Sequence, residues 1–466
     1  MNKPEADIRP RGALRVEPGG ARLRRHLGML ARLAWPVMLS RAGILAMALV
    51  DVIMLGRYAT LALAEASVAL GLFIPIMVTA VGLQMGVISL VSRRFGAGKT
   101  EECVDIWRRS LPWATAAGLA GAALMALGFL WLRLIGQSEA LAEGGGAVSF
   151  VLAPGVLFQV LYITCAFYLE GSGRPKPAML AMLAANALNV ALNWVFIYGN
   201  LGAPELGAVG SAISTSLVRV FLFLVVLIVI LRLPEVRAAG GLRRMGGFWG
   251  PGGWRAGAEM RRIGYAAGLS VGFETSAFGA LMQMAGLLGP TALAAYSIAH
   301  NIEATVFMVA LGLSVATAVR VGSEAGAGRL GEARFAGWLG LAACFVVMGG
   351  IGLGLVAAPE ALAAVYTVDP AVQGVTVGLL FVVAVTVLPD GGQIVMGQCN
   401  RALGDTFVSS GLYFIAFWLA MVPLGALFAF ELDMGAAGLM WASVAGATLS
   451  LLLQGARFAA LSRRRA

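Results

Sequence analysis

The stretch "ALAEASVALGLFIPIMVTAVGLQMGVISLVSRRFGAGK", from Ala62 to Lys99, returns later in the chain as "ALAAYSIAHNIEATVFMVALGLSVATAVRVGSEAGAGR", from Ala292 to Arg329. The two stretches align without a gap at an offset of 230 residues, so that Gly96 falls on Gly326. Further along, "LGAVG" at 206–210 is echoed by "MGAAG" at 434–438. Repetition on this scale predicts a chain built from two homologous halves.

The composition places both halves in a membrane. Of the 466 residues, 59% are hydrophobic and 12% are charged, whereas a soluble chain carries about 25% charged residues. Apolar runs of about 20 residues or more are typical of membrane-spanning helices. We predict an all-α integral membrane protein with twelve transmembrane helices, near 30–56, 66–92, 110–133, 147–169, 177–198, 207–231, 263–288, 293–319, 335–357, 371–399, 407–429 and 435–459.

An even number of helices in each half makes the repeats parallel, related by an axis along the membrane normal. The predicted organisation is two pseudo-symmetric six-helix bundles, an N-lobe at 30–233 and a C-lobe at 263–460, joined by a basic cytoplasmic linker at 234–262. Residues 1–29 lack the compact apolar core of a signal peptide, so we interpret them as a mobile cytoplasmic tail. Residues 461–466 form a second cytoplasmic tail.

The net charge of +10 has a distribution that argues against nucleic acid as a partner. Basic residues gather in the connections on one side of the membrane, whereas the opposite connections carry only Arg57 and Arg133 among several acidic residues. This positive-inside pattern places both termini in the cytoplasm. We therefore expect a multi-pass membrane protein whose basic excess sets its orientation and contacts anionic lipid.

Two sequence features that could suggest a cofactor site do not indicate one. "RRFGAGKT" at 93–100 looks like part of a phosphate-binding loop, but Arg93 stands where that motif requires glycine, so no nucleotide-driven pump is indicated. The four cysteines show neither metal-ligand spacing nor a pairing pattern. We expect no cofactor beyond a coupling ion.

Glu274 and Asp390 stand alone in apolar surroundings on the predicted seventh and tenth helices. At about 1.5 Å per residue, they lie roughly 18 Å and 16 Å from the inner surface, so they could face one another near the midplane. Two close carboxylates in low dielectric require a proton or a cation between them. Pro389 also frees the Val385 carbonyl as a possible ligand. The alternative is two unrelated carboxylates, each bonded to its neighbours.

The N-terminal half has its own polar cluster. Asn186, Asn189 and Asn193 share one face of the fifth helix, and Asn193 lies near the estimated depth of Asp51. These groups could bind a proton, a cation or a cationic drug. The alternative is that they only hold helices together by hydrogen bonds.

The eighth helix carries a stripe of Tyr296, His300, Glu303 and Phe307. His300 and Glu303 could carry protons or simply neutralise each other. Arg41 could extend to the surface or pair with a carboxylate in a cavity. The residues considered as candidates for lining a substrate cavity are Arg41, Asn186, Gln283, Tyr296, His300, Asn301, Glu303 and Gln393.

At these residues the chain resembles the multidrug and toxic compound extrusion (MATE) family, in its bacterial NorM-like branch. The most specific stretch is "LNVALNWVFIYGNLGAPELGAVG" at 188–210, supported by "VDVIMLG" at 50–56, "RVGSEAGAG" at 320–328 and "RALGDT" at 401–406. The resemblance covers residues 27–460. It implies a drug/cation antiporter with a V-shaped pair of six-helix lobes.

The resemblance also implies roles for particular residues. It places Glu274 and Asp390 in a cation site, with Na⁺ as a candidate metal ion, and Asp51, Asn189 and Asn193 in a second site in the N-lobe. Some members have a tyrosine where this chain has Thr386. Arg41, His300 and Glu303 also depart from the family pattern, which leaves the coupling ion open between Na⁺ and H⁺.

We expect a monomeric secondary transporter that exports amphipathic, cationic organic compounds in exchange for Na⁺ or H⁺. The main alternative is a flippase for lipid-linked oligosaccharides, whose cavity for an anionic pyrophosphate should be strongly basic. An enzyme is not expected: a membrane hydrolase needs a nucleophile with a base or a metal-ligand set, and the only histidines are His26 and His300. A channel is not indicated either, since no repeated ring of pore-lining residues is visible.

Overall fold

The computed structural model describes residues 19–244 and 253–464, and these residues are almost entirely helical. The elements are α1 (Gly19–Tyr58), α2 (Thr60–Gly96), α3 (Thr100–Ala126), α4 (Gly128–Leu134), α5 (Glu139–Gly171), α6 (Lys176–Phe196), η1 (Asn200–Gly202), α7 (Gly207–Leu231), α8 (Pro234–Ala238), η2 (Gly241–Arg244), η3 (Gly253–Gly257), α9 (Ala258–Leu287), α10 (Pro290–Gly326), α11 (Leu330–Ala357), α12 (Pro359–Tyr366), α13 (Pro370–Ala402), α14 (Phe407–Phe414), η4 (Ile415–Met421), α15 (Val422–Ala426), η5 (Leu427–Glu431) and α16 (Gly435–Arg464).

These elements confirm the twelve predicted membrane helices. Within the described ranges, ten helices are long and apolar enough to cross a membrane, and the bent pair α3–α4 forms an eleventh. The twelfth is α9, which is long but carries charged residues at its start and Glu274 in its middle. Many exposed side chains on the bundle are large and apolar, such as Leu183, Val346 and Leu353. A water-facing surface would disfavour such side chains, whereas lipid accommodates them.

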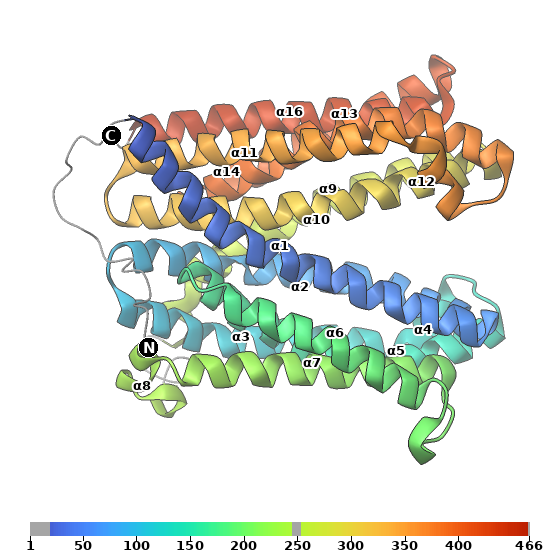
Figure 1. The fold of residues 1–466 in the computed structure, drawn as a ribbon, viewed down its shortest axis with the longest axis horizontal. Helices are drawn as coiled ribbons and strands as arrows, with labels where there is room; N and C mark the ends of the chain where they lie inside the picture. The colour runs from blue at the N-terminus through green and yellow to red at the C-terminus, as the bar shows by residue number, and fades with distance from the viewer. Residues whose placement is uncertain (1–18, 245–252, 465–466) are drawn as a thin grey trace.

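Figure 1 shows the helices as two bundles lying side by side, with α2, α3, α5, α6 and α7 in one and α10, α11, α13, α14 and α16 in the other. Each bundle has its own buried apolar core. α1 runs obliquely from the second bundle to the first (Figure 1). The two-lobe architecture is therefore confirmed, with one helix shared.

The tail predicted at 1–29 is partly wrong, because residues 19–29 are the first turns of α1. Similarly, α16 continues to Arg464, through most of the second predicted tail. Residues 1–18, 465–466 and 245–252 of the predicted linker lie outside the described residues. The described parts of that linker form α8, η2, η3 and the start of α9.

The repeated "GAG" at 96–98 and 326–328 has a structural cause. Gly98 and Gly328 have left-handed φ angles of 76° and 75°, which glycine adopts at little cost, and they end α2 and α10 in the same way. Gly96 and Gly326 lie in close contact with the opposite lobe. A Cβ atom on Gly96 would overlap the backbone of Ser323, and one on Gly326 would overlap that of Arg93.

These contacts follow the 230-residue repeat. The contact of Gly96 with Ser323 is equivalent to that of Gly326 with Arg93, because each residue of one contact lies 230 positions from its counterpart in the other. The contact of Gly82 with Gly268 is equivalent in the same way to that of Gly312 with Met38. All lie toward one end of the molecule, which we call the basic end because it carries the connections at 97–99 and 327–329. The lobes therefore meet closely at this end, as the arms of a V do.

The first helix of each half packs into the other half. Leu30 and Ala34 of α1 lie in the C-lobe core, whereas Met260 and Ile263 of α9 lie in the N-lobe core. The division at residues 30 and 263 therefore describes the sequence repeat better than it describes the packing.

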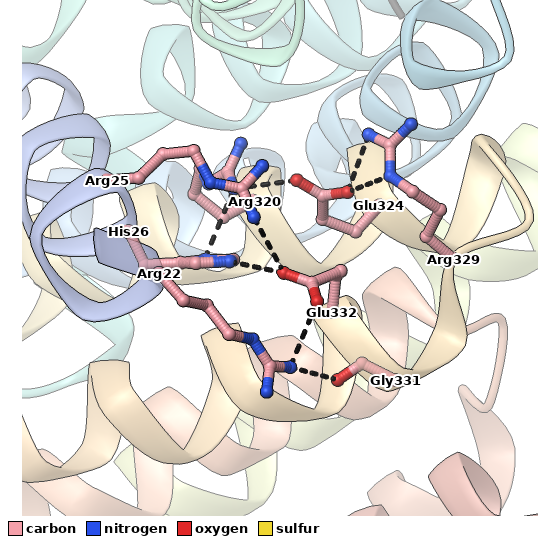
Figure 2. A network of polar contacts seen from close by, with 8 residues as sticks. All are labelled: Arg22, Arg25, His26, Arg320, Glu324, Arg329, Gly331 and Glu332. Carbon is pink, nitrogen blue, oxygen red and sulfur yellow. Dashed lines mark hydrogen bonds and ion pairs between the residues drawn. The ribbon is translucent and has the colours of Figure 1, made fainter. Parts of the chain in front are cut away.

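Polar contacts fasten the start of α1 to the C-lobe (Figure 2). Glu332, at the start of α11, accepts from Arg22 at 3.0 Å and from Arg25 at 3.1 Å. His26 Nε2 lies 2.7 Å from the same carboxylate, and Arg320 lies 3.3 Å from the other ring nitrogen of His26. The start of α1 is therefore held by charge-assisted hydrogen bonds, which are stronger than neutral ones.

Candidate functional site

Asp51 is the centre of a polar cluster between α1, α6 and α7. Its Oδ1 accepts hydrogen bonds from Asn189 at 3.1 Å and from Asn193 at 2.6 Å, and its Oδ2 accepts one from Thr215 at 3.3 Å. Both asparagines are fully buried. The structure therefore brings together the three N-lobe residues predicted from the sequence, and adds Thr215.

The cluster has the chemistry of a small cation or proton site. The Asp51 carboxylate contributes a negative charge, and the Asn193 Oδ1 atom has no hydrogen-bond partner among the described residues. A carboxylate oxygen and an amide oxygen are ligands that hard cations prefer. The same geometry also holds the three helices together, so a transport measurement must separate the two roles.

Asp51→Asn keeps the size of this side chain and removes its charge. We expect export to fall by about tenfold or more, equivalent to about 1.4 kcal/mol, while the amount of protein in the membrane stays near that of the wild type. Dye efflux from cells, normalised to protein level, measures this. Wild-type efflux from cells carrying Asp51→Asn would reduce the cluster to a structural role.

Glu274 of α9 and Asp390 of α13 are joined through a third side chain. Gln393 Nε2 donates to Glu274 Oε1 at 2.8 Å and to Asp390 Oδ1 at 3.3 Å. Gln393 Oε1 in turn accepts from Ser450 at 3.3 Å. The two carboxylates therefore share one local environment, as their depth suggested, with Gln393 linking them.

Both carboxylates line a cavity of about 600 Å³ between the lobes, which we call the central cavity. Glu303, His300 and Arg41 also line it. The rest of its wall is largely apolar and rich in methionine and phenylalanine, contributed by α1, α2, α5, α9, α10 and α13. Methionine side chains adapt to ligands of varied shape.

His300 lies among aromatic rings on the cavity wall. Its ring stacks on Phe278 with centroids 5.1 Å apart and on Tyr296 with centroids 6.2 Å apart. Its Nδ1 atom lies 3.4 Å from Glu303 Oε2. The predicted contact of His300 with Glu303 is therefore present, and His300 presents an aromatic as well as a titratable surface.

Arg41 pairs with a carboxylate that sequence reasoning missed. Its Nη2 atom lies 3.5 Å from Oε2 of Glu170 on α5, and both side chains are largely buried. Arg41 thus pairs with a carboxylate, as one of its two alternatives required, but Glu170 is not among the residues that line the central cavity. Glu170 could have been found, because it directly follows an apolar run that ends at residue 169.

Several candidates lie outside the central cavity. The Asn186 amide donates to the Met182 carbonyl of its own helix. The Gln283 side chain is exposed. The Asn301 side chain is also exposed and accepts a hydrogen bond from Tyr366 at 3.2 Å. Tyr296 is fully buried behind His300, and Gln393 lies behind the two carboxylates that it links. Val385 is exposed and does not line the cavity, so the ligand role suggested for its carbonyl gains no support.

Comparison with known proteins agrees with this geometry. A family model described as MatE matches residues 36–195 and 266–427. The chain belongs to the MatE family. The family resemblance seen in the sequence is thus confirmed, and the two matched segments fall one in each half of this MatE protein.

Curated relatives cover nearly the whole chain. A probable multidrug resistance protein NorM from Caulobacter vibrioides is 35% identical over 93% of this chain and 89% of its own length. The multidrug resistance protein PmpM from Pseudomonas aeruginosa is 30% identical over 96% of this chain and 94% of its own length.

Solved structures share the fold of this MatE chain. One described as an outward-facing conformation of a multidrug resistance MATE family transporter has a TM-score of 0.83 at 22% identity, covering 95% of this chain and 99% of that one. A eukaryotic MATE transporter has a TM-score of 0.84 at 17% identity, with the same coverage. At these identities the likeness concerns the fold alone.

Proposed function

We propose that this MatE-family protein is a secondary active exporter of amphipathic, cationic organic compounds, driven by the exchange of Na⁺ or H⁺. The central cavity is the observation that carries this proposal. Three carboxylates, from Glu274, Glu303 and Asp390, line an otherwise largely apolar space between two repeated lobes. Such a space suits a hydrophobic ligand with a positive charge. Relatives named as multidrug resistance proteins support the same function.

Coupling follows from competition for negative charge. A proton or Na⁺ bound near Glu274 and Asp390 neutralises carboxylate charge that would otherwise attract a cationic compound. The described residues contain no group of three or more His, Cys, Asp and Glu side chains suited to a metal ion. A Na⁺ ion would therefore need neutral oxygens in addition to these two carboxylates.

The setting of this exporter follows from its charge pattern. We place both of its termini in the cytoplasm, because the basic connections gather at one end. We also propose that it is a monomer of the bacterial inner membrane. Its partners are drug-like compounds, the coupling ion and lipid. It has no nucleic-acid partner and acts as a transporter, without enzymatic chemistry.

The cavity argues against the flippase alternative. An anionic pyrophosphate carrier would be repelled by the three carboxylates of the central cavity. Arg41, the basic group in that cavity, is already paired with Glu170. A cationic compound is therefore the better match.

Dye transport in proteoliposomes tests the proposal. We expect the methyl ester of a rhodamine dye, which is a cation, to move against an imposed Na⁺ or H⁺ gradient, and a K⁺ gradient of the same size to have no effect. The fluorescence of the dye reports its movement. Dye movement that ignores both the Na⁺ and the H⁺ gradient would contradict the exchange mechanism.

A further inference from the structure

A second cavity, of about 250 Å³, lies within the N-lobe, and we call it the N-lobe cavity. It is lined by Asp51 of α1 and by Thr215 and Arg219, which lie one turn apart on α7. Arg41 and Met77 line both this space and the central cavity. The two cavities are therefore neighbours that meet beside Arg41.

Arg219 is a buried charge without an ion-pair partner among the described residues. Its side chain is 7% exposed, in the middle of α7. Its guanidinium lies over the ring of Phe73, 4.2 Å from the centroid. Nη1 has no hydrogen-bond partner in the part of the chain that the structure describes. An unpaired buried charge is costly, which makes this group available to a ligand.

Asp51 lies close enough to attract this guanidinium, but no hydrogen bond joins the two groups among the described residues. The Asp51 carboxylate accepts its hydrogen bonds from Asn189, Asn193 and Thr215. None of the ion pairs within 4.0 Å among the described residues includes Arg219. The N-lobe cavity thus presents a positive group beside the negative cluster.

Arg41, with Glu170 as its counter-ion, brings a second guanidinium group to the place where the cavities meet. Its pairing with Glu170 is long, at 3.5 Å, and its Nε atom has no hydrogen-bond partner among the described residues. Cationic side chains therefore lie toward the N-lobe, and three carboxylates lie toward the C-lobe. The N-lobe side of the binding space therefore holds two guanidinium groups together with the Asp51 and Glu170 carboxylates, whereas the C-lobe side holds three carboxylates.

We propose that Arg219 binds the carboxylate of zwitterionic amphipathic compounds, whose ammonium group lies among the carboxylates of the central cavity. A guanidinium matches a carboxylate through two parallel N–H···O hydrogen bonds, and Phe73 holds the plane of the guanidinium from one side. This inference rests on the proposed function and narrows its substrate class. The two charges of such a compound would engage charged groups of both lobes, whereas the charge of a simple cation would engage only the carboxylates of the C-lobe.

A matched pair of dyes tests the role of Arg219. A rhodamine free acid and its methyl ester share one fluorophore, and only the acid carries a carboxylate. We expect Arg219→Gln to weaken binding of the acid to the purified protein by about tenfold or more, and to change binding of the ester by less than about threefold. Fluorescence polarisation measures both affinities.

Two further variants make the result decisive. Arg219→Lys keeps the charge but loses the paired donors, so its preference for the acid should fall between wild type and Arg219→Gln. If Arg219→Gln does not fold, Arg219→Lys replaces it in the binding measurements. Arg133→Gln removes an arginine whose side chain is 54% exposed, and should alter neither affinity.

Two results would contradict the proposed role of Arg219. Equal losses for acid and ester would show that Arg219 serves the structure or the charge balance of Asp51. Unchanged acid binding would also overturn the proposal. Gradient-driven transport of the ester by the wild type tests the exporter function separately, because the ester does not need Arg219.

Discussion

Glu274→Gln and Asp390→Asn are each expected to reduce gradient-driven dye export by about tenfold or more, and the double variant should be little worse than either. The reason is the link through Gln393, which donates to both carboxylates. If both groups hold one ion, removing either charge destroys the site. Transport in proteoliposomes under an imposed Na⁺ or H⁺ gradient measures all three variants.

A local reporter and a control sharpen this test. The Trp418 indole donates to the Phe273 carbonyl at 3.2 Å, directly before Glu274 in the chain. Its fluorescence, isolated by comparison with Trp418→Phe, should respond to the coupling ion in wild type and lose that response in both single variants. Glu431→Gln, at an exposed position, should transport normally. Losses that multiply in the double variant would mean two independent sites.

Gly326→Val is expected to hold the lobes apart at the basic end. A side chain there would overlap the backbone of Arg93, and overpacking of this kind costs about 1–3 kcal/mol. A cost of about 2 kcal/mol shifts a two-state equilibrium by about thirtyfold. We therefore expect export to fall and the central cavity to become accessible from the basic end.

Cysteine labelling measures this change in access. Ala318 lines the central cavity, and a cysteine there should react with a membrane-impermeant maleimide from the basic end much faster in Gly326→Val than in the parent. A Cβ atom on Gly354 would meet no other atom within 4 Å, so Gly354→Val serves as the control. Equal labelling rates in parent and Gly326→Val would show that this glycine contact does not close the basic end.

The sequence was sufficient for the architecture because its signals are periodic. The 230-residue repeat and the apolar runs give twelve helices in two lobes. The predicted contacts of Asp51 with Asn189 and Asn193 are also present, since depth and helical spacing restrict them. Whether these residues bind an ion stays a prediction.

Contacts that depend on side-chain direction could not be predicted in this way. Asn186 lies on the same helix as Asn193, but its amide bonds to its own backbone. Gln283 and Asn301 face outward although their helices line the cavity. Arg219 is different: a lone arginine inside the apolar run 207–231 was visible in the sequence, and its significance emerged only when the cavity around it was known.

The packing of each first helix against the other half has a consequence for how the two repeats complete their apolar cores. With Leu30 and Ala34 of α1 in one core and Met260 and Ile263 of α9 in the other, a single six-helix repeat would lack a complete interior. Two identical copies could complete each other by lending their first helices reciprocally, as domain-swapped dimers with two-fold symmetry do. The present chain keeps that dimeric pattern within one polypeptide, with the first turns of each first helix in the core of the other half and its later turns in the core of its own.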